Sequence, residues 1–269
     1  MQPAGYAAIM LKTIVAFACS LFFVAACHAA PQPAVTITTL PEAGAFPHDI
    51  LGRVLQKYVS AEGKVDYAGI ATDRADFDQY LAYLAATSPK KHPALFPTKD
   101  DELAYYINAY NAFAILGVIS RPGIKGVNDN LPDFFYFTTY QMGGKKTSLG
   151  TLENKIVRKQ FQDARVHFAL NCQSGGCPRL PAVIFDPKRL GAQLDELTTE
   201  FVTNPAKVEL RADGKVHISQ IFEWYADDFK DAGGPVAYIN AHGGSVPTDK
   251  EVAIIPYDWT LIAAPGRAP

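Results

Sequence analysis

The chain has 269 residues, which is enough for one large domain or two small ones with a sizeable core. Hydrophobic residues make up 48% and charged residues 19% of the sequence, a balance that excludes a chain disordered throughout. The net charge is -2 and no basic run is longer than two residues. Nucleic acid is therefore not predicted as a partner.

The first 30 residues have the pattern of a secretory signal segment. Lys12 precedes an apolar run from Ile14 to Ala26 that is short for a membrane-spanning helix. The letters VAAC, which end at Cys27, resemble a bacterial lipobox and would place a lipid anchor to the membrane on that residue. The residues that follow Cys27 also resemble an ordinary signal-peptidase site, and the sequence leaves both open. Either site predicts an exported protein, periplasmic or envelope-associated.

The remainder of the chain is expected to be one domain behind a linker. Residues 31–47 are rich in Pro and Thr and predict an extended linker, and residues 48–264 predict a single domain. Apolar residues recur at helical spacing over 48–59, and again over the stretch that ends at Ser88-Pro89. Both patterns predict amphipathic helices.

The next expected helix, between Thr98 and Pro122, is apolar on nearly every face and should lie at the centre of the core. Thr98 with Asp101 forms a capping-box signal at its start. The helix carries Asn108 and Asn111 on one face. A buried amide needs hydrogen-bond partners. The pair either satisfies nearby backbone or lines a pocket and orients a catalytic group, and the sequence does not decide.

The second half mixes helices with short strands, and Glu153 lies near a helix start, where the dipole favours an acid. Helices outnumber strands and the strands cluster late, so the fold class is α+β: a helix-rich domain with a central apolar helix and a small, mostly antiparallel sheet. The expected elements are a strand or loop over 131–141, a helix from Ser148 through Phe161, a buried strand over 166–170, a helix from Asp186-Pro187, a hairpin over 207–218, a short helix capped by Ser219 and a strand over 252–262.

The stretch VHFALNCQSGGCPRL, over 166–180, gathers the reactive side chains. A catalytic interpretation makes Cys172 the nucleophile and His167 its base, with Asn108, Asn111 and Asn171 nearby. An extended chain would separate His167 from Cys172 by roughly 16 Å, so the backbone must fold back after residue 170. Asn171 and the double glycine that follows it permit such a turn.

Two other interpretations use the same residues. A zinc site would need His167, Cys172 and Cys177, but their spacing matches no strong zinc signature, so neither metal nor cofactor is predicted. A disulfide between Cys172 and Cys177 is expected as the resting state of an exported protein and does not exclude a redox role on reduction. Of the two thiols, Cys172 is expected to be the more reactive, with Cys177 as staple or resolving partner.

Six segments together resemble the bacterial and plant family called domain of unknown function 547. They are KVDYAGI, LAYYINAYNAFAI, LGTLENKIVR, RVHFALNCQSGGCP, ISQIFEWYADDF and YDWTLI, in this order between Val65 and Leu261. The last segment departs from the family, which more often has Leu-Asn where this chain has Leu261-Ile262. The resemblance implies no assigned activity. Because plant relatives carry the domain inside cells, it also implies that disulfides alone do not explain the thiol segment.

The layout also shows a faint similarity to papain-like and transglutaminase-like enzymes, although those begin their central helix with the nucleophilic Cys and this helix carries Asn108. Two functions are therefore expected as alternatives. One is a thiol-dependent hydrolase, transferase or thiol-exchange protein centred on Cys172, which predicts a cleft that exposes this residue. The other is a non-catalytic envelope binding module with a structural disulfide, which predicts a buried Cys172 and an aromatic patch elsewhere.

Overall fold

The computed structural model describes residues 36–37, 39–42 and 46–269. The predicted signal segment, the lipid-attachment site at Cys27 and part of the linker over 31–47 lie outside the described residues. None of the described helices combines the length and the apolar character needed to cross a membrane.

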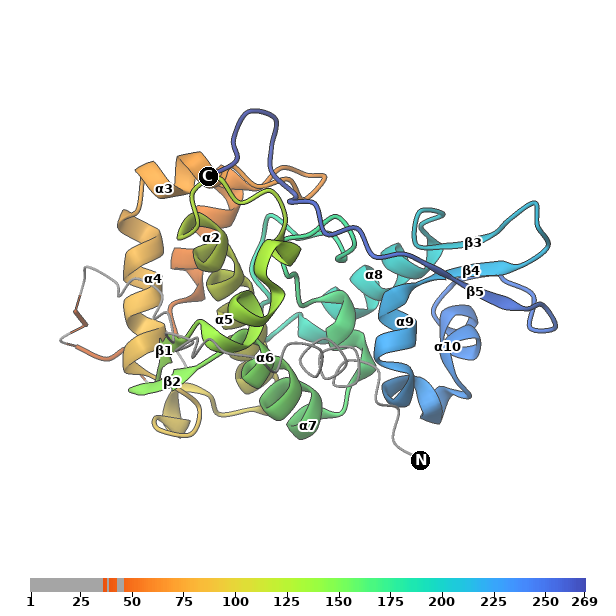
Figure 1. Ribbon diagram of the computed structural model, residues 1–269. Helices are drawn as coiled ribbons and strands as arrows, with labels where there is room; N and C mark the ends of the chain where they lie inside the picture. Colours follow the sequence, from red (N-terminus) through yellow and green to blue (C-terminus); the bar gives the residue numbers. More distant parts are fainter. Residues whose placement is uncertain (1–35, 38, 43–45) are drawn as a thin grey trace, which may run out of the picture.

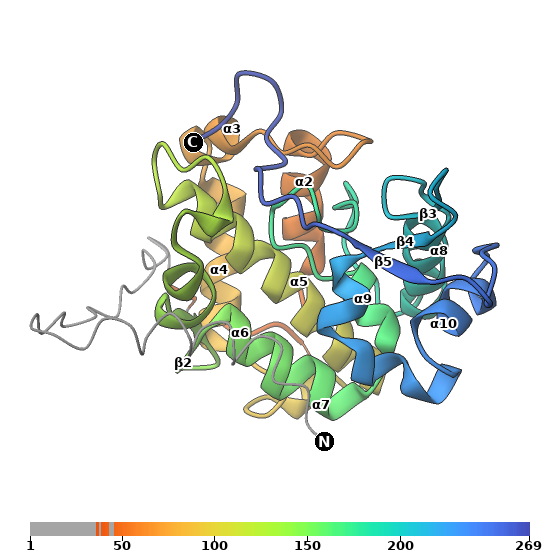
Figure 2. The ribbon, with the colours of Figure 1, turned by 45° about the vertical axis from the view of Figure 1, so that its right-hand side comes forward.

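Helix α5 (Lys99–Ile119) runs through the middle of the molecule, as Figures 1 and 2 show. The Asp101 N–H donates to the Thr98 hydroxyl, and the Thr98 N–H donates to the Asp101 carboxylate, which confirms the predicted capping box. Every residue from Leu103 to Val118 is buried. A helix that is apolar all round has no face for water, so its place at the centre of the core follows from the sequence.

The N-terminal helices pack on one side of α5 (Figure 1). The two helices predicted before residue 90 are confirmed, and α2 packs against α4. These elements are α2 (His48–Tyr58), α3 (Tyr67–Thr72), α4 (Ala75–Ala86) and the 3₁₀ turn η1 (Pro93–Leu95).

The chain after α5 forms short elements on another side of that helix. The strand or loop expected over 131–141 is mostly helical turns, and the helix expected from Ser148 to Phe161 is interrupted by a π-helical segment. The elements are η2 (Val127–Asn130), the π turn η3 (Asp133–Phe137), the antiparallel strands β1 (Tyr140–Met142) and β2 (Lys145–Thr147), α6 (Leu149–Thr151), the π segment η4 (Leu152–Val157) and α7 (Arg158–Phe161).

The strand predicted over 166–170 is wrong: the chain forms the 3₁₀ helix η5 (Ala164–Phe168) there. The Asp163 carboxylate accepts the Arg165 N–H and starts the turn, and the amides of Ala169 and Leu170 donate to the Val166 carbonyl. A short apolar run does not distinguish a buried strand from a buried helical turn, because both hide every side chain.

A second cluster of elements follows, at the right in Figure 1. The hairpin predicted over 207–218 is confirmed, whereas the last strand is shorter than predicted and pairs parallel to β4. Two of the three strand pairings described are antiparallel, so the fold is α+β with a small sheet. The elements are α8 (Leu190–Thr203), β3 (Val208–Leu210), β4 (Val216–Ser219), α9 (Gln220–Trp224), η6 (Ala226–Ala232), α10 (Pro235–Ala241) and β5 (Val252–Ile255).

The segment after β5 runs back across the molecule toward α3 (Figure 1). On the way, Leu261 forms a bridge with Ser174 and Ala263 forms one with Val65. The Ile262 N–H also donates to the Gln173 carbonyl at 3.1 Å. The C-terminal segment therefore pairs with the loop that carries the two cysteines, more than eighty residues earlier in the chain.

Candidate active site

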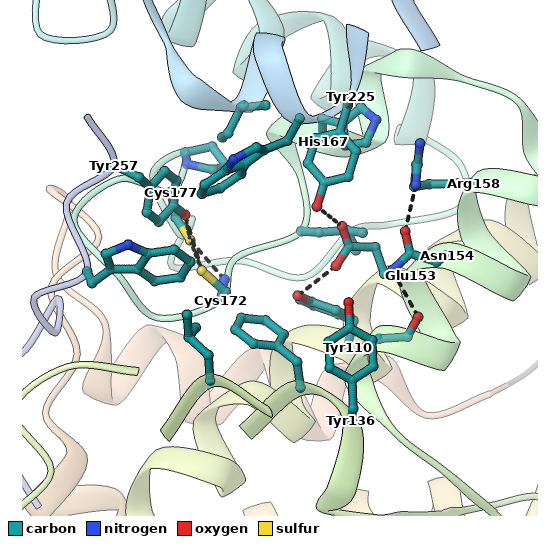
Figure 3. Close-up of a pocket in the computed structure, with 18 residues that line it drawn as sticks. Tyr110, Tyr136, Glu153, Asn154, Arg158, His167, Cys172, Cys177, Tyr225 and Tyr257 are labelled. Carbon is teal, nitrogen blue, oxygen red and sulfur yellow. Dashed lines mark hydrogen bonds between the residues drawn. The ribbon is translucent and has the colours of Figure 1, made fainter. Parts of the chain in front are cut away.

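A cavity of about 180 Å³ lies between α5, η4 and the elements around α9 (Figure 3). Two sets of side chains stand at opposite sides of it in Figure 3. We call Cys172, Cys177 and Tyr257 the thiol end, and Glu153 with its partners the carboxylate end. The full lining is Tyr110, Leu131, Phe135, Tyr136, Gly150, Glu153, Asn154, Arg158, His167, Leu170, Cys172, Cys177, Pro178, Ile221, Trp224, Tyr225, Tyr257 and Trp259.

The loop over residues 171–178, which we call the thiol loop, is held by two asparagine side chains. The Asn111 side chain donates to the Ala169 carbonyl at 3.0 Å and accepts the Asn171 N–H at 2.8 Å. The Asn171 side chain in turn donates to the Pro178 carbonyl at 2.7 Å and accepts the Gln173 N–H at 2.7 Å. The first amide fixes the start of the loop to α5, and the second ties its two ends together.

Gln173 adopts a left-handed backbone conformation, with φ of 71°. This conformation is uncommon for a residue other than Gly, Asn or Asp, and it persists where the surroundings fix it. The Gln173 side chain is fully buried, donates to the Asn171 carbonyl and accepts the Tyr67 hydroxyl at 2.9 Å. The left-handed turn at Gln173 therefore comes after Cys172, and the 3₁₀ helix η5, not a reversal of an extended strand, leads from His167 to the thiol loop.

Gly175 and Gly176 form the predicted turn, which the Cys177 N–H closes on the Ser174 carbonyl at 3.0 Å, and their missing side chains have a second role. Neither lies in the left-handed region. A Cβ on Gly175 would come within 2.1 Å of the Asp258 carboxylate, and one on Gly176 would come within 2.6 Å of the Tyr257 ring. The double glycine therefore lets the C-terminal segment lie directly on the thiol loop, which brings Tyr257 to the sulfurs.

Cys172 and Cys177 are free thiols, so the predicted disulfide is not formed in this structure. Cys172 is only 8% exposed, which is the burial expected of the binding module and not the exposure expected of the enzyme, although both cysteines line the cavity. Their Sγ atoms lie 2.7 Å apart, in hydrogen-bond contact. The Tyr257 hydroxyl is 3.0 Å from the Cys177 Sγ and 3.2 Å from the Cys172 Sγ. The Cys172 N–H points at the Cys177 Sγ at 3.0 Å, whereas the Cys172 Sγ contacts the Ser174 hydroxyl at 3.0 Å.

These contacts separate the acidities of the two thiols. Burial alone would raise the pKa of Cys177, but hydrogen bonds from Cys172, Tyr257 and the local backbone bring it down to about 7. Burial raises the pKa of Cys172 well above its usual value, and the neighbouring Cys177 raises it further. These contacts therefore favour Cys177 as the thiol that ionises first, while Cys172 keeps its proton.

At the carboxylate end, Glu153 is only 7% exposed and belongs to the π segment η4. The Tyr110 hydroxyl donates to one of its oxygens at 3.1 Å, and the Tyr225 hydroxyl donates to the other at 2.5 Å. Glu153 lies in the first turn of η4, as the sequence predicted, but its carboxylate is buried and hydrogen-bonded to two tyrosines, which the sequence did not predict. Its carboxylate accepts hydrogen bonds from α5 and from the turn after α9, and π segments recur at functional sites.

Beside Glu153, Asp228 is hydrogen-bonded to both Arg158 and His167. Asp228 accepts two hydrogen bonds from Arg158, at 2.7 and 3.0 Å, and lies 2.7 Å from the His167 Nε2. Burial opposes ionisation of Asp228, but His167 and Arg158 hold its pKa well below the usual range. The rings of His167 and Tyr225 stack with centroids 4.0 Å apart, and the guanidinium of Arg158 lies over the Tyr225 ring at 4.6 Å. His167 and Arg158 thus hold the Tyr225 ring in the position from which its hydroxyl donates to Glu153.

The five residues predicted for the site have different places in the structure. Cys172 and His167 both line the cavity, but within the described residues His167 makes no hydrogen bond to a thiol. Asn111 and Asn171 position the thiol loop without lining the cavity. Asn108 lies elsewhere: its side chain donates to the Phe185 carbonyl, accepts the Phe185 N–H and contacts His48. The hydrogen-bonding interpretation of the asparagines holds, and the pocket-lining interpretation does not.

The carboxylate end was missed by sequence reasoning, although its residues lie in the segments quoted for the resemblance. Tyr110 lies in LAYYINAYNAFAI, Glu153 and Arg158 lie in LGTLENKIVR, and Tyr225 and Asp228 lie in ISQIFEWYADDF. The signal available in the sequence was that these tyrosines and charged residues all lie in the segments that carry the resemblance.

Three aromatic rings close the thiol end of the cavity. The Tyr257 ring lies 4.8 Å from that of Trp224 and 4.5 Å from that of Trp259, measured between centroids. No group of three or more His, Cys, Asp or Glu side chains within the described residues is arranged to hold a metal ion. In particular, His167 contacts Asp228 and does not converge with Cys172 and Cys177.

Residues 96–202 match the model of the family described as protein of unknown function, DUF547. The matched stretch includes Glu153, His167 and both thiols, and it ends before Tyr225 and Tyr257. No curated protein and no solved structure matches the chain. The papain-like or transglutaminase-like layout therefore remains a prediction.

Proposed function

We propose that this chain, whose residues 96–202 match the DUF547 family of unassigned activity, exchanges thiols and disulfides through Cys172 and Cys177. The observation that supports this most is the pair of free thiols in hydrogen-bond contact on the wall of a cavity. Exchange needs a thiolate, access to a disulfide and a second thiol in reach. Hydrolysis or acyl transfer would need a base at the thiol, and His167 is bonded to Asp228 instead.

The proposed reaction begins at Cys177, whereas the sequence favoured Cys172. The Cys177 thiolate attacks one sulfur of a small disulfide RS–SR, and RS⁻ leaves and takes up a proton. The product is a mixed disulfide between Cys177 and R. Cys172 then gives up its proton and attacks the Cys177 Sγ, and the second RS⁻ leaves. The two cysteines lose two electrons and two protons, and RS–SR gains both as two RSH.

Tyr257 and the Cys172 backbone amide support the first step. Burial and the neighbouring sulfurs raise the pKa of Tyr257 well above its usual value, so its hydroxyl keeps its proton and can donate it in a hydrogen bond to a thiolate. The Cys172 N–H is a fixed donor to the Cys177 Sγ. Donors that are already aligned stabilise the charge without reorganisation, which favours Cys177 as the attacking group.

Single substitutions at the two cysteines test the proposal with 2-hydroxyethyl disulfide as the probe. With Cys172→Ser, Cys177 still attacks but nothing resolves the product, so a mixed disulfide on Cys177 should accumulate and be visible by mass spectrometry. With Cys177→Ser, the remaining Cys172 has the Tyr257 and Ser174 hydroxyls beside it but its pKa stays raised by burial, so adduct formation at pH 7 should be about tenfold slower or more.

Cys172→Ser,Cys177→Ser provides the control that removes both sulfurs and keeps the rest of the cavity. It should form no adduct at these positions while melting at a similar temperature. If the wild-type protein reduces no disulfide and both single variants resist labelling equally, the thiols are structural. That result would favour the alternative, a binding module in which Cys172 and Cys177 pair permanently.

We further propose that the reaction takes place outside the cytoplasm, in the periplasm or at the envelope, on the strength of the signal-like segment before residue 31. Mass spectrometry of the protein from its native host should show loss of that segment. A mass increase of the size of a lipid on Cys27 would support an anchored form, and a full-length cytoplasmic species would contradict export.

A further inference from the structure

We propose that the cavity selects a thiol or disulfide that carries an ammonium group, with Glu153 binding the ammonium while the substrate sulfur meets Cys177. This inference rests on the exchange activity proposed above and names its substrate class. It starts from the arrangement in Figure 3, where a buried carboxylate faces the thiol pair across the cavity.

Glu153 has unused hydrogen-bonding capacity directed at the cavity. A carboxylate offers about four acceptor positions. Tyr110 and Tyr225 donate one hydrogen bond each to Glu153, and its side chain lines the cavity. No lysine or arginine forms an ion pair with it among the described residues. An ammonium group carries three N–H donors, which could occupy the acceptor positions of Glu153 that the two tyrosines leave unused.

Arg158, which also lines the carboxylate end, does not change the preference for a cationic ligand. Arg158 is the cationic lining residue, but Asp228 accepts two of its hydrogen bonds and Asn154 accepts a third at 2.6 Å. Its charge is therefore balanced by Asp228, and its guanidinium lies over the Tyr225 ring. Arg158 also interacts electrostatically with Glu153, but its hydrogen bonds go to Asp228 and Asn154 and none goes to Glu153, so the acceptors of the carboxylate end favour a cation over an anion.

The aromatic walls agree with the same ligand. Trp224, Tyr257 and Trp259 line the cavity at the thiol end, and Tyr225 lines it at the carboxylate end, where His167 and Arg158 already lie against its ring. Aromatic faces attract organic cations, and they also cover the short apolar linker that would join an ammonium group to a sulfur. A ligand with a cationic head, an aliphatic linker and a sulfur matches the carboxylate, the rings and the thiols in turn.

Three symmetrical disulfides test this selection: cystamine, which is cationic, 2-hydroxyethyl disulfide, which is neutral, and 3,3'-dithiodipropionate, which is anionic. Each rate is divided by the rate of the same disulfide with a free small thiol, which removes intrinsic reactivity. The wild-type protein should react about tenfold faster with cystamine than with the neutral probe, and slowest with the anion. Equal normalised rates, or a preference for the anion, would overturn the inference.

Glu153→Gln should reduce the cystamine preference to about twofold or less, because the amide keeps the shape and removes the charge. The matched control is Glu251→Gln, which removes a carboxylate that is paired with Lys215 in an exposed position outside the cavity. That control should keep the full preference. Loss of preference in both variants would mean that the overall charge of the protein steers cystamine, and would contradict a role for Glu153.

A binding experiment on the wild-type protein separates this inference from the proposed exchange. 1,6-Diaminohexane has the length and charge of cystamine but no sulfur, and 1,6-hexanediol is its neutral counterpart. The diamine should slow iodoacetamide labelling of Cys177 about tenfold at saturation, and the diol should not. If the diamine protects but no disulfide is reduced, the exchange proposal alone fails. If exchange occurs without charge preference or protection, the substrate class alone is wrong.

Discussion

The thiol end of the cavity comes from one loop and one C-terminal segment, whereas the carboxylate end takes side chains from α5, η4, η5 and the turns around α9. At the thiol end the backbone is held closely: Asn171 spans the loop, and Gly176 packs on the Tyr257 ring. At the carboxylate end, side chains supply the contacts over sequence separations of 43 residues to Tyr110 and 72 residues to Tyr225. We therefore expect backbone geometry to set the reactivity of the thiols, and the assembled side chains of the carboxylate end to select their substrate.

The largest expected effect on stability is at Gly176. Gly176→Ala places a Cβ within 2.6 Å of the half-buried Tyr257 ring, so the C-terminal segment must move off the thiol loop. We expect a loss of about 2–3 kcal/mol in the free energy of unfolding, measured by urea titration. The control is Gly191→Ala in α8, where nothing lies within 4 Å, and this change should be neutral or stabilising by up to about 1 kcal/mol. Equal effects in both variants would contradict the close-packing role of Gly176.

The two asparagines of α5 give the next comparison. Asn108→Leu leaves the buried N–H and carbonyl of Phe185 unpaired, and Asn111→Leu does the same to Asn171 and Ala169. Each should cost about 2 kcal/mol in the free energy of unfolding. Only Asn111→Leu should also change the rate of Cys177 alkylation, because only this side chain holds the thiol loop. A change in alkylation by Asn108→Leu alone would contradict the assignment.

Removing the Tyr257 hydroxyl should have a smaller effect, visible in the pH dependence of labelling. Thiolate forms as the pH rises through the pKa, so the rate of Cys177 alkylation in the wild-type protein should rise with a midpoint near pH 7. Tyr257→Phe removes one donor to the thiolate, and the midpoint should move upward by up to about one pH unit. An unchanged or lowered midpoint would show that the hydroxyl does not stabilise the thiolate.

Sequence patterns predicted those features of the molecule that depend on residues close together in the chain. The run of apolar residues in α5 has no polar face, so its burial followed from composition alone. The thiol loop was recognised because its cysteines, asparagine and double glycine lie within eight positions. The burial of Glu153 was not predicted because its partners, Tyr110 and Tyr225, are distant in sequence and helical periodicity carries no information about them. The sequence marks the double glycine as a turn, but the Tyr257 ring that leaves no room for a Cβ at Gly176 lies about eighty residues later in the chain.

The central claim, that Cys172 and Cys177 form a reversible redox pair in the folded protein, is tested most directly by a redox titration. The protein is equilibrated in buffers of graded dithiothreitol and oxidised dithiothreitol, then alkylated, and the free thiols at the two positions are read by peptide mapping. We predict that both thiols disappear in one two-electron transition, that a Cys172–Cys177 disulfide replaces them, and that reduction restores them while the near-UV circular dichroism stays native-like. Thiols that are lost one at a time, or only after the native circular dichroism is gone, would contradict the claim.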